Sequence, residues 1–233
     1  PSYGDYDPFL IVVMEDSARI AGLYRAALPG LADELKQKVE NDMLHLYRRY
    51  RDFVFDGALA AELSAARDAL IAELELFRDA VNADEDFVVC KALVGFDSVH
   101  PYEWDEPEEH YEFDKRRAYS TARADEYVDQ LTGPNTGRWP LIAARCADLH
   151  GGETAGMGRF LRRVGETKPQ IARSWLAPFS ASPASGFLRP LLDGLSVSQP
   201  QWVRSFIDAS LTRGENLAPI LSFFHTHEPL DLD

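Results

Sequence analysis

The sequence predicts an all-α protein, with an N-terminal helical hairpin or bundle followed by helix-turn-helix repeats. Apolar residues recur at helical spacing along residues 59–81. Turn-forming clusters return at short intervals after residue 131. The octapeptide PQIARSWL at Pro169–Leu176 also has a near copy, PQWVRSFI, at Pro200–Ile207. We expect a helical region, an acidic proline-containing loop and a repeat region, at residues 1–96, 97–115 and 116–233.

The N-terminal region is expected to form three long helices. The first covers Leu10–Leu28 and ends at a Pro-Gly pair, and the second covers Leu31–Phe53. The third presents one apolar face, built from Leu59, Leu63, Ala66, Leu70, Leu74, Phe77 and Val81. Residues 86–96 fit a short buried helix or, alternatively, a strand.

The acidic loop, Asp97–Asp114, holds eight carboxylates and two histidines, His100 and His110. No HxxEH or HExxH spacing places two ligands on one helical face, so we expect a solvated loop and no metal site. Tyr102 and Trp104 are candidate anchors for a protein partner. Alternatively, the two rings pack the loop onto the body of the protein.

Helices resume at Arg116–Leu131 and continue toward the C-terminus. Turn clusters stand near residues 133, 150, 165, 180, 196 and 212. After residue 150 these turns leave room for five short helices.

Both octapeptides are predicted helix starts. Each proline lies in a Ser/Thr-x-x-Gln box, which opens at Thr167 or Ser198 and whose hydroxyl we expect to accept from a helix amide. Proline is tolerated in the first turn because its amide would have no partner there. Arg173 and Arg204 take equivalent places, so stacked helices would align them on one ridge that binds carboxylate or phosphate. The alternative is an intramolecular ladder to neighbouring acids.

A fainter third copy, WPLIAARCADL, places Pro140 29 residues before Pro169, which precedes Pro200 by 31. A helix-turn-helix unit of this length cannot bury its apolar face alone, so neighbouring units stack into an α-solenoid. On these motifs, residues 116–224 resemble HEAT-type helical repeats. The resemblance implies a sensing or docking tail of a larger multidomain protein, such as a bacterial signalling protein.

The charge of the chain is unevenly distributed. Residues 135–233 carry 10 Lys or Arg against 9 Asp or Glu, whereas the whole chain has 24 against 38, so residues 1–134 carry a net charge of −15 and residues 135–233 a net charge of +1. An acidic surface repels phosphate. We therefore expect no nucleic-acid binding through the N-terminal part, whereas the charge of the C-terminal part does not exclude it.

The composition predicts a soluble, cytoplasmic protein without a membrane partner. Of 233 residues, 45% are hydrophobic, and the most apolar opening stretch, Phe9–Tyr24, already contains three charges. Cys90 and Cys146 are far apart and form no CxxC motif, so we expect two reduced thiols. The first residue, Pro1, suggests an excised fragment of a longer protein.

One motif suggests catalysis. RCADLH places Arg145 and His150 on either side of four residues, which resembles the active motif of HEPN ribonucleases. The resemblance implies cleavage of RNA, although Cys146 follows the arginine where that family favours a polar residue. A structural histidine at a helix C-terminus is the alternative for His150. The His225–His227 tail is expected to be frayed and not to bind metal.

The sequence favours a non-enzymatic helical-repeat module that binds a protein or another domain of its parent chain, with no cofactor. The candidate binding residues are Arg173, Arg204, Trp104 and Tyr102. The alternative is the ribonuclease that uses Arg145 and His150. A third hypothesis is a small-molecule receptor whose pocket is lined by Trp139 and Trp175.

Overall fold

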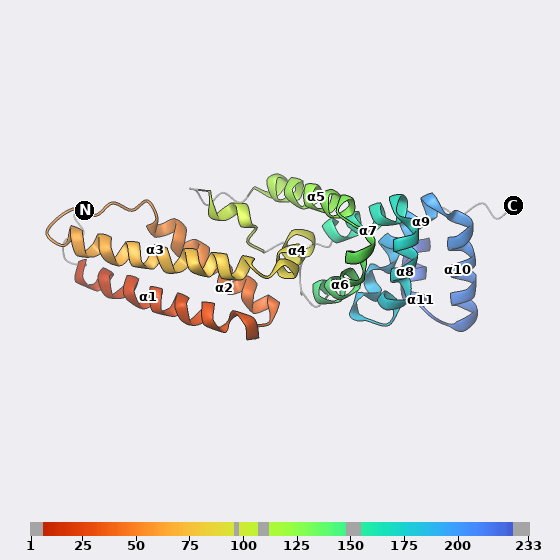
Figure 1. The fold of residues 1–233 in the computed structure, drawn as a ribbon, viewed down its shortest axis with the longest axis horizontal. Coiled ribbons are helices and arrows are strands. Elements are labelled where there is room, and N and C mark those ends of the chain that lie inside the picture. Colours follow the sequence, from red (N-terminus) through yellow and green to blue (C-terminus); the bar gives the residue numbers. More distant parts are fainter. Residues whose placement is uncertain (1–6, 96–97, 107–111, 148–154, 226–233) are drawn as a thin grey trace. The chain divides into compact units, whose positions relative to one another are not determined.

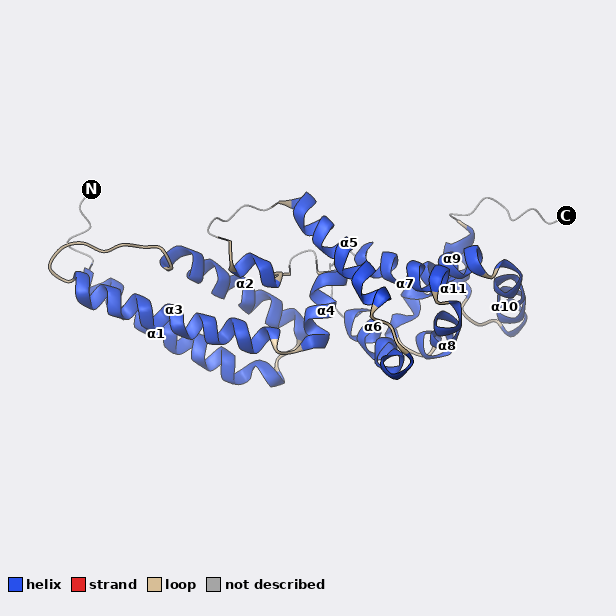
Figure 2. Cartoon of the chain, turned by 45° about the horizontal axis from the view of Figure 1, so that its top comes forward, coloured by secondary structure: helices blue, strands red, loops and turns tan. Residues whose placement is uncertain are grey.

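The computed structural model describes residues 7–95, 98–106, 112–147 and 155–225. Within these ranges every regular element is a helix, which confirms the predicted all-α class (Figures 1 and 2). None of the described helices combines the length and apolar character that a membrane crossing requires. The chain divides into two compact units, Pro1–Val88 with Asp97–Tyr111 and Val89–Phe96 with Glu112–Asp233.

Three long helices build the first unit. They are α1 (Asp7–Ala27), α2 (Asp33–Tyr50) and α3 (Ala60–Asn82). Helices α1 and α2 both pack on α3, and α1 runs alongside it (Figure 1). The 3-10 turn η1 (Leu28–Gly30) separates α1 from α2, because Pro29 cannot donate the amide that would continue the first helix.

The apolar face predicted for the third helix forms the centre of this unit. Six of its seven positions are buried in α3, namely Leu63, Ala66, Leu70, Leu74, Phe77 and Val81. Burial of each large apolar side chain contributes about 1.5–3 kcal/mol to folding. The helix favoured for residues 86–96 is confirmed up to residue 94, since α4 covers Glu85–Val94.

Part of the acidic loop is buried in the first unit, whereas the sequence predicted a solvated loop. The 3-10 helix η2 (Pro101–Trp104) carries the buried side chains Glu103 and Trp104, and His100 before it is also buried. Arg48 of α2 donates a hydrogen bond of 3.0 Å to the Glu103 carbonyl. The burial of this loop could not be predicted from its acidic composition, because it depends on contacts with residues that are distant in the sequence.

The second unit consists of short helices joined by tight turns. They are α5 (Phe113–Asp129), α6 (Trp139–Ala147), α7 (Ala155–Thr167), α8 (Pro169–Ser180), α9 (Leu188–Ser198), α10 (Pro200–Arg213) and α11 (Leu217–Phe224), with 3-10 turns η3 (Gly133–Arg138) and η4 (Pro183–Phe187). Helices α5, α7, α9 and α11 pack against one another in that order, and α6 packs on α8. The five helices expected after residue 150 are present as α7 to α11.

Two glycines bring the backbones of α7 and α9 into contact. A Cβ atom on Gly194 would overlap the carbonyl oxygen of Arg162, and one on Gly165 would lie 2.6 Å from the Leu195 nitrogen. Either side chain would therefore push the two helices apart. The close approach explains why glycine stands inside two helices, where it otherwise costs about 1 kcal/mol relative to alanine.

The turns before α8 and α10 have nearly the same backbone conformation. Lys168 has φ −132° and ψ 56°, Gln199 has φ −143° and ψ 59°, and a proline is the first residue of each helix. The predicted helix starts are thus confirmed. The predicted capping boxes are wrong, because the Thr167 hydroxyl donates to the Arg163 carbonyl and the Ser198 hydroxyl donates to the Gly165 carbonyl, both at 2.7 Å.

The two cysteines form a disulfide, so the prediction of two reduced thiols is wrong. Cys90 of α4 and Cys146 of α6 are 56 residues apart, yet their Cα atoms lie 5.3 Å from each other. Sequence separation does not report this proximity, which arises only when α6 folds back. Because disulfides persist in oxidising compartments, the pairing also removes the basis for expecting a cytoplasmic protein.

Candidate functional site

An open groove of about 600 Å³ runs between α8 and α10 in the second unit. We call it the aromatic groove. It is lined by Arg173, Leu176, Ala177, Ser180, Ala181, Trp202, Phe206, Arg213, Glu215 and Asn216. Helix α10 packs on α9, and this leaves its side toward α8 available to solvent.

Two aromatic rings form one wall of the aromatic groove. Trp202 and Phe206 stand one turn apart on α10, and their ring centroids are 5.5 Å apart with the planes nearly parallel. Both side chains are only partly buried. Behind them, Val203 and Ile207 are buried in the core and fix the rotation of α10. The two rings therefore lie at the surface of the second unit.

Arg173 of α8 reaches across the aromatic groove. Its guanidinium carbon lies 4.5 Å from the centroid of the Trp202 ring, a cation–π contact worth about 0.5–1 kcal/mol where solvent is present. Arg204 is exposed and does not line the groove. The two predicted binding arginines therefore have different surroundings, and their alignment on one ridge stays a prediction.

The far end of the aromatic groove is polar. Arg213 and Glu215 form an ion pair of 2.7 Å there. Between them Gly214 ends α10 in the left-handed conformation, with φ 69°, where glycine carries no steric penalty. A stacked aromatic wall and a charged end thus meet in one open groove.

Trp175 is the octapeptide residue that corresponds to Phe206, and its surroundings are different. Its ring is 2% exposed, and its Nε1 donates a hydrogen bond of 3.0 Å to the Thr136 carbonyl. Trp139 and Phe179 lie on either side, with ring centroids 6.4 and 6.2 Å away. Both Trp139 and Trp175 belong to the core of the second unit and do not line the aromatic groove. The hypothesis that they line a ligand pocket stays a prediction.

The two candidate anchors of the acidic loop lie in the first unit. Trp104 is fully buried, and its Nε1 donates a hydrogen bond of 3.3 Å to Glu40. Its ring also meets Tyr47 edge-on at 5.4 Å. Of the two alternatives for Trp104, the exposed anchor is wrong and the packing of the loop onto the body is confirmed. Tyr102 is partly buried and stacks on His100 at 5.8 Å.

The histidines singled out in the sequence are mostly outside the described residues. Arg145 is partly buried on α6, whereas His150, its predicted partner in the ribonuclease motif, falls beyond the described part of the chain. The same holds for His110 and His227. Among the residues that are described, no group of His, Cys, Asp and Glu is arranged to hold a metal ion. The ribonuclease motif stays a prediction.

A second groove runs along α7, and the sequence did not predict it as a site. We call it the arginine groove. It measures about 940 Å³ and is lined by Cys146, Ala147, Ala155, Gly158, Arg159, Arg162, Arg163, Glu166, Pro183, Gly186, Phe187, Arg189, Pro190, Asp193 and Ser222. The segment RFLRR was a usable signal, because arginines at i, i+3 and i+4 share one helical face.

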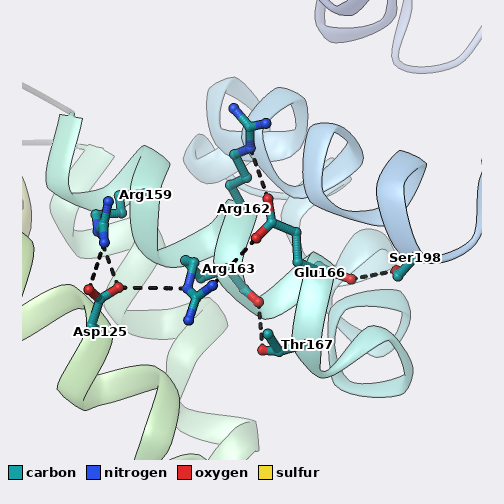
Figure 3. A network of polar contacts seen from close by, with 8 residues as sticks. Asp125, Arg159, Arg162, Arg163, Glu166, Thr167 and Ser198 are labelled. Atoms are coloured by element: carbon teal, nitrogen blue, oxygen red, sulfur yellow. Dashed lines mark hydrogen bonds and ion pairs between the residues drawn. The ribbon is translucent and has the colours of Figure 1, made fainter.

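Charged contacts connect the arginine groove to α5 (Figure 3). Arg159 donates two hydrogen bonds to Asp125, at 3.1 and 2.7 Å. These bonds hold the pKa of the Asp125 carboxyl below its usual value and raise the pKa of Arg159. Arg162 pairs with Glu166 one turn away, at 3.1 Å.

The described part of the second unit thus presents two grooves of different chemistry, one aromatic and one cationic. No protein-family model matches the chain, and no match was found among curated proteins or solved structures.

Proposed function

We propose that this chain is a non-enzymatic helical-repeat interaction module, which binds a segment of a protein partner in the aromatic groove. The observation that carries the proposal is the Trp202–Phe206 pair, held at the surface and crossed by Arg173. Tryptophan and arginine are the residues most enriched at binding hot spots, where a few side chains supply most of the affinity.

The repeat architecture in this proposal is HEAT-like. It is supported by the order in which α5, α7 and α9 pack. It is also supported by the matching conformations of Lys168 and Gln199, each followed by a proline-initiated helix. Stacked helix pairs leave elongated grooves between successive helices of one row, and repeat proteins use such extended surfaces to bind partners.

The lining of the aromatic groove defines the kind of segment that fits. An aliphatic side chain would cover the Trp202 and Phe206 rings and remove their partly exposed faces from water, at about 25 cal/mol per Å². The Arg213–Glu215 pair at the far end would contact polar groups of the partner backbone. We therefore expect an extended peptide with an aliphatic anchor.

Selection of a displayed random-peptide library against the full chain tests this function. We expect recovered peptides to share an aliphatic anchor and to lose at least about 30-fold in affinity when Trp202 becomes alanine, the loss that defines a hot spot. Leu211→Ala is the matched control, because Leu211 is an exposed apolar residue of the same helix outside the groove.

Two outcomes would overturn the proposal. The first is that recovered peptides bind Trp202→Ala as tightly as the unaltered chain. The second is that the chain cleaves RNA and that His150→Ala abolishes the cleavage, which would establish the ribonuclease alternative with Arg145 as its partner.

A further inference from the structure

The arginine groove has unequal numbers of cations and anions. Four guanidiniums line it, from Arg159, Arg162 and Arg163 of α7 and from Arg189 of α9. The carboxylates of the lining are Glu166 and Asp193, and Asp125 of α5 lies beside it. Cations therefore outnumber anions even when Asp125 is included. Because the chain as a whole is strongly acidic, this local excess stands out against the rest of the molecule.

The four guanidiniums also differ in how many of their N–H donors already form hydrogen bonds. Arg159 is committed, since two of its nitrogens bind Asp125. Arg163 lies 3.7 Å from Asp125 and 3.8 Å from Glu166, which is beyond hydrogen-bonding distance for both. Its contacts are electrostatic and leave its donors available for a stronger acceptor.

Arg162 and Arg189 have the same spare capacity. Arg162 contacts Glu166 through Nε, and its two terminal nitrogens point away from that carboxylate (Figure 3). Arg189 lies 3.9 Å from Asp193, and its one side-chain hydrogen bond to a described residue is a 3.4 Å bond to the Ser222 hydroxyl. A guanidinium has five donors, so both arginines have several left to offer a ligand.

We propose that the arginine groove is a second binding site, which takes an acidic peptide segment. Carboxylates of the segment would accept charge-assisted, bidentate hydrogen bonds from Arg162, Arg163 and Arg189. Apolar side chains between those carboxylates would pack on Pro183, Phe187 and Pro190 in the lining. This site lies on other helices than the aromatic groove, and it stands or falls independently of the proposed function.

The lining favours a peptide over a nucleic acid. Glu166 and Asp193 interrupt the cations of the groove, and a continuous row of phosphates would be repelled at both positions. A peptide avoids them, because its carboxylates can be spaced and its backbone amides can donate to these acids.

Fluorescence anisotropy with a labelled short peptide of alternating glutamate and leucine tests the proposal on the full chain. We expect saturable binding that weakens about tenfold or more in the double variant Arg162→Gln, Arg189→Gln, since charged hydrogen bonds are lost. The matched control is Arg204→Ala, an exposed arginine outside the groove, which should bind normally. Trp202→Ala should also bind normally, which separates this site from the aromatic groove.

A variant that is expected to strengthen binding distinguishes the proposal from misfolding, which could only weaken it. Glu166→Gln removes the carboxylate that Arg162 and Arg163 share, and it should tighten peptide binding severalfold. Asp208→Asn, on an exposed part of α10, is its control and should change nothing. Absence of binding, equal losses in Arg204→Ala, weaker binding by Glu166→Gln, or tighter binding of a single-stranded RNA than of the peptide would each overturn the proposal.

Discussion

Two helix junctions of the second unit, α6 with α8 and α8 with α10, differ in how far they bury the aromatic side chains of similar sequences. At the first junction Trp175 is buried between Trp139 and Phe179 and donates to a backbone carbonyl. At the second, Trp202 and Phe206 remain partly exposed and line an open groove. The octapeptide places aromatic residues on both helices, yet only one junction closes.

The difference comes from the neighbouring helices. Helix α8 packs on α6 as well as on α7 and α9, whereas α10 packs on α9 and α11. The arginine shared by the two octapeptides differs in the same way, since Arg173 covers Trp202 while Arg204 faces solvent. An aromatic residue of the octapeptide is therefore part of the core where a neighbouring helix covers it, as at Trp175. It stays accessible to solvent where no described helix packs over it, as at Trp202.

The largest effect is expected at the closed junction. Trp175→Ala should lower the free energy of unfolding by about 3–5 kcal/mol, because it leaves a cavity among buried rings. Chemical denaturation followed by circular dichroism measures this loss. Leu211→Ala, on the surface of α10, should stay within about 0.5 kcal/mol of the unaltered chain. Similar losses in both variants would contradict the assignment of Trp175 to the core.

The disulfide links α6, one helix of the closed junction, to α4. Cys146→Ser should lower the free energy of unfolding by about 2–4 kcal/mol, because a link across 56 residues restricts the unfolded chain. Denaturation of the unaltered chain with and without a reductant should show the same difference. If the reductant leaves the unfolding midpoint unchanged, the two thiols are not paired.

The open junction should respond weakly in stability and strongly in binding. Trp202→Ala removes a partly exposed ring and its contact with Arg173, so we expect a loss of about 1 kcal/mol in unfolding free energy. Its effect on affinity for groove-binding peptides should be much larger. A stability loss as great as that of Trp175→Ala would show that the second junction is also part of the core.

The smallest effect concerns the row formed by α5, α7 and α9. The hydrogen bonds from Arg159 lower the pKa of Asp125 in the folded protein, so the carboxylate adds stability above its unfolded pKa of about 3.9. That contribution disappears as the pH falls through the lower, folded pKa. Because the pair is partly exposed, Asp125→Asn should cost less than about 1 kcal/mol near neutral pH. The difference from the unaltered chain should vanish in acid, and a difference that grows there would have the wrong sign.

Much of the helical architecture could be predicted from local patterns. The spacing of apolar residues located α3, and the prolines at 169 and 200 located the first residues of α8 and α10. These features depend on neighbours within a few positions, which the sequence displays directly. The hydroxyls of Thr167 and Ser198 were misjudged, because their acceptors belong to the preceding turn and to a neighbouring helix.

The candidate site was less accessible to sequence reasoning. Arg173 was predicted to be a binding residue, but its position over Trp202 depends on how α10 packs against α9. The disulfide and the burial of Trp104 likewise depend on contacts between residues more than 50 positions apart. Local composition cannot specify such contacts, whereas it can specify a helix start.

The most direct test of the contrast between the two junctions is acrylamide quenching of tryptophan fluorescence. Trp104, Trp139 and Trp175 are at most 5% exposed, which leaves Trp202 as the accessible ring of the four. Trp202→Phe should therefore remove most of the quenchable emission, and Trp175→Phe should leave it in place. Quenching that survives Trp202→Phe, or that disappears in Trp175→Phe, would contradict an open junction at α10.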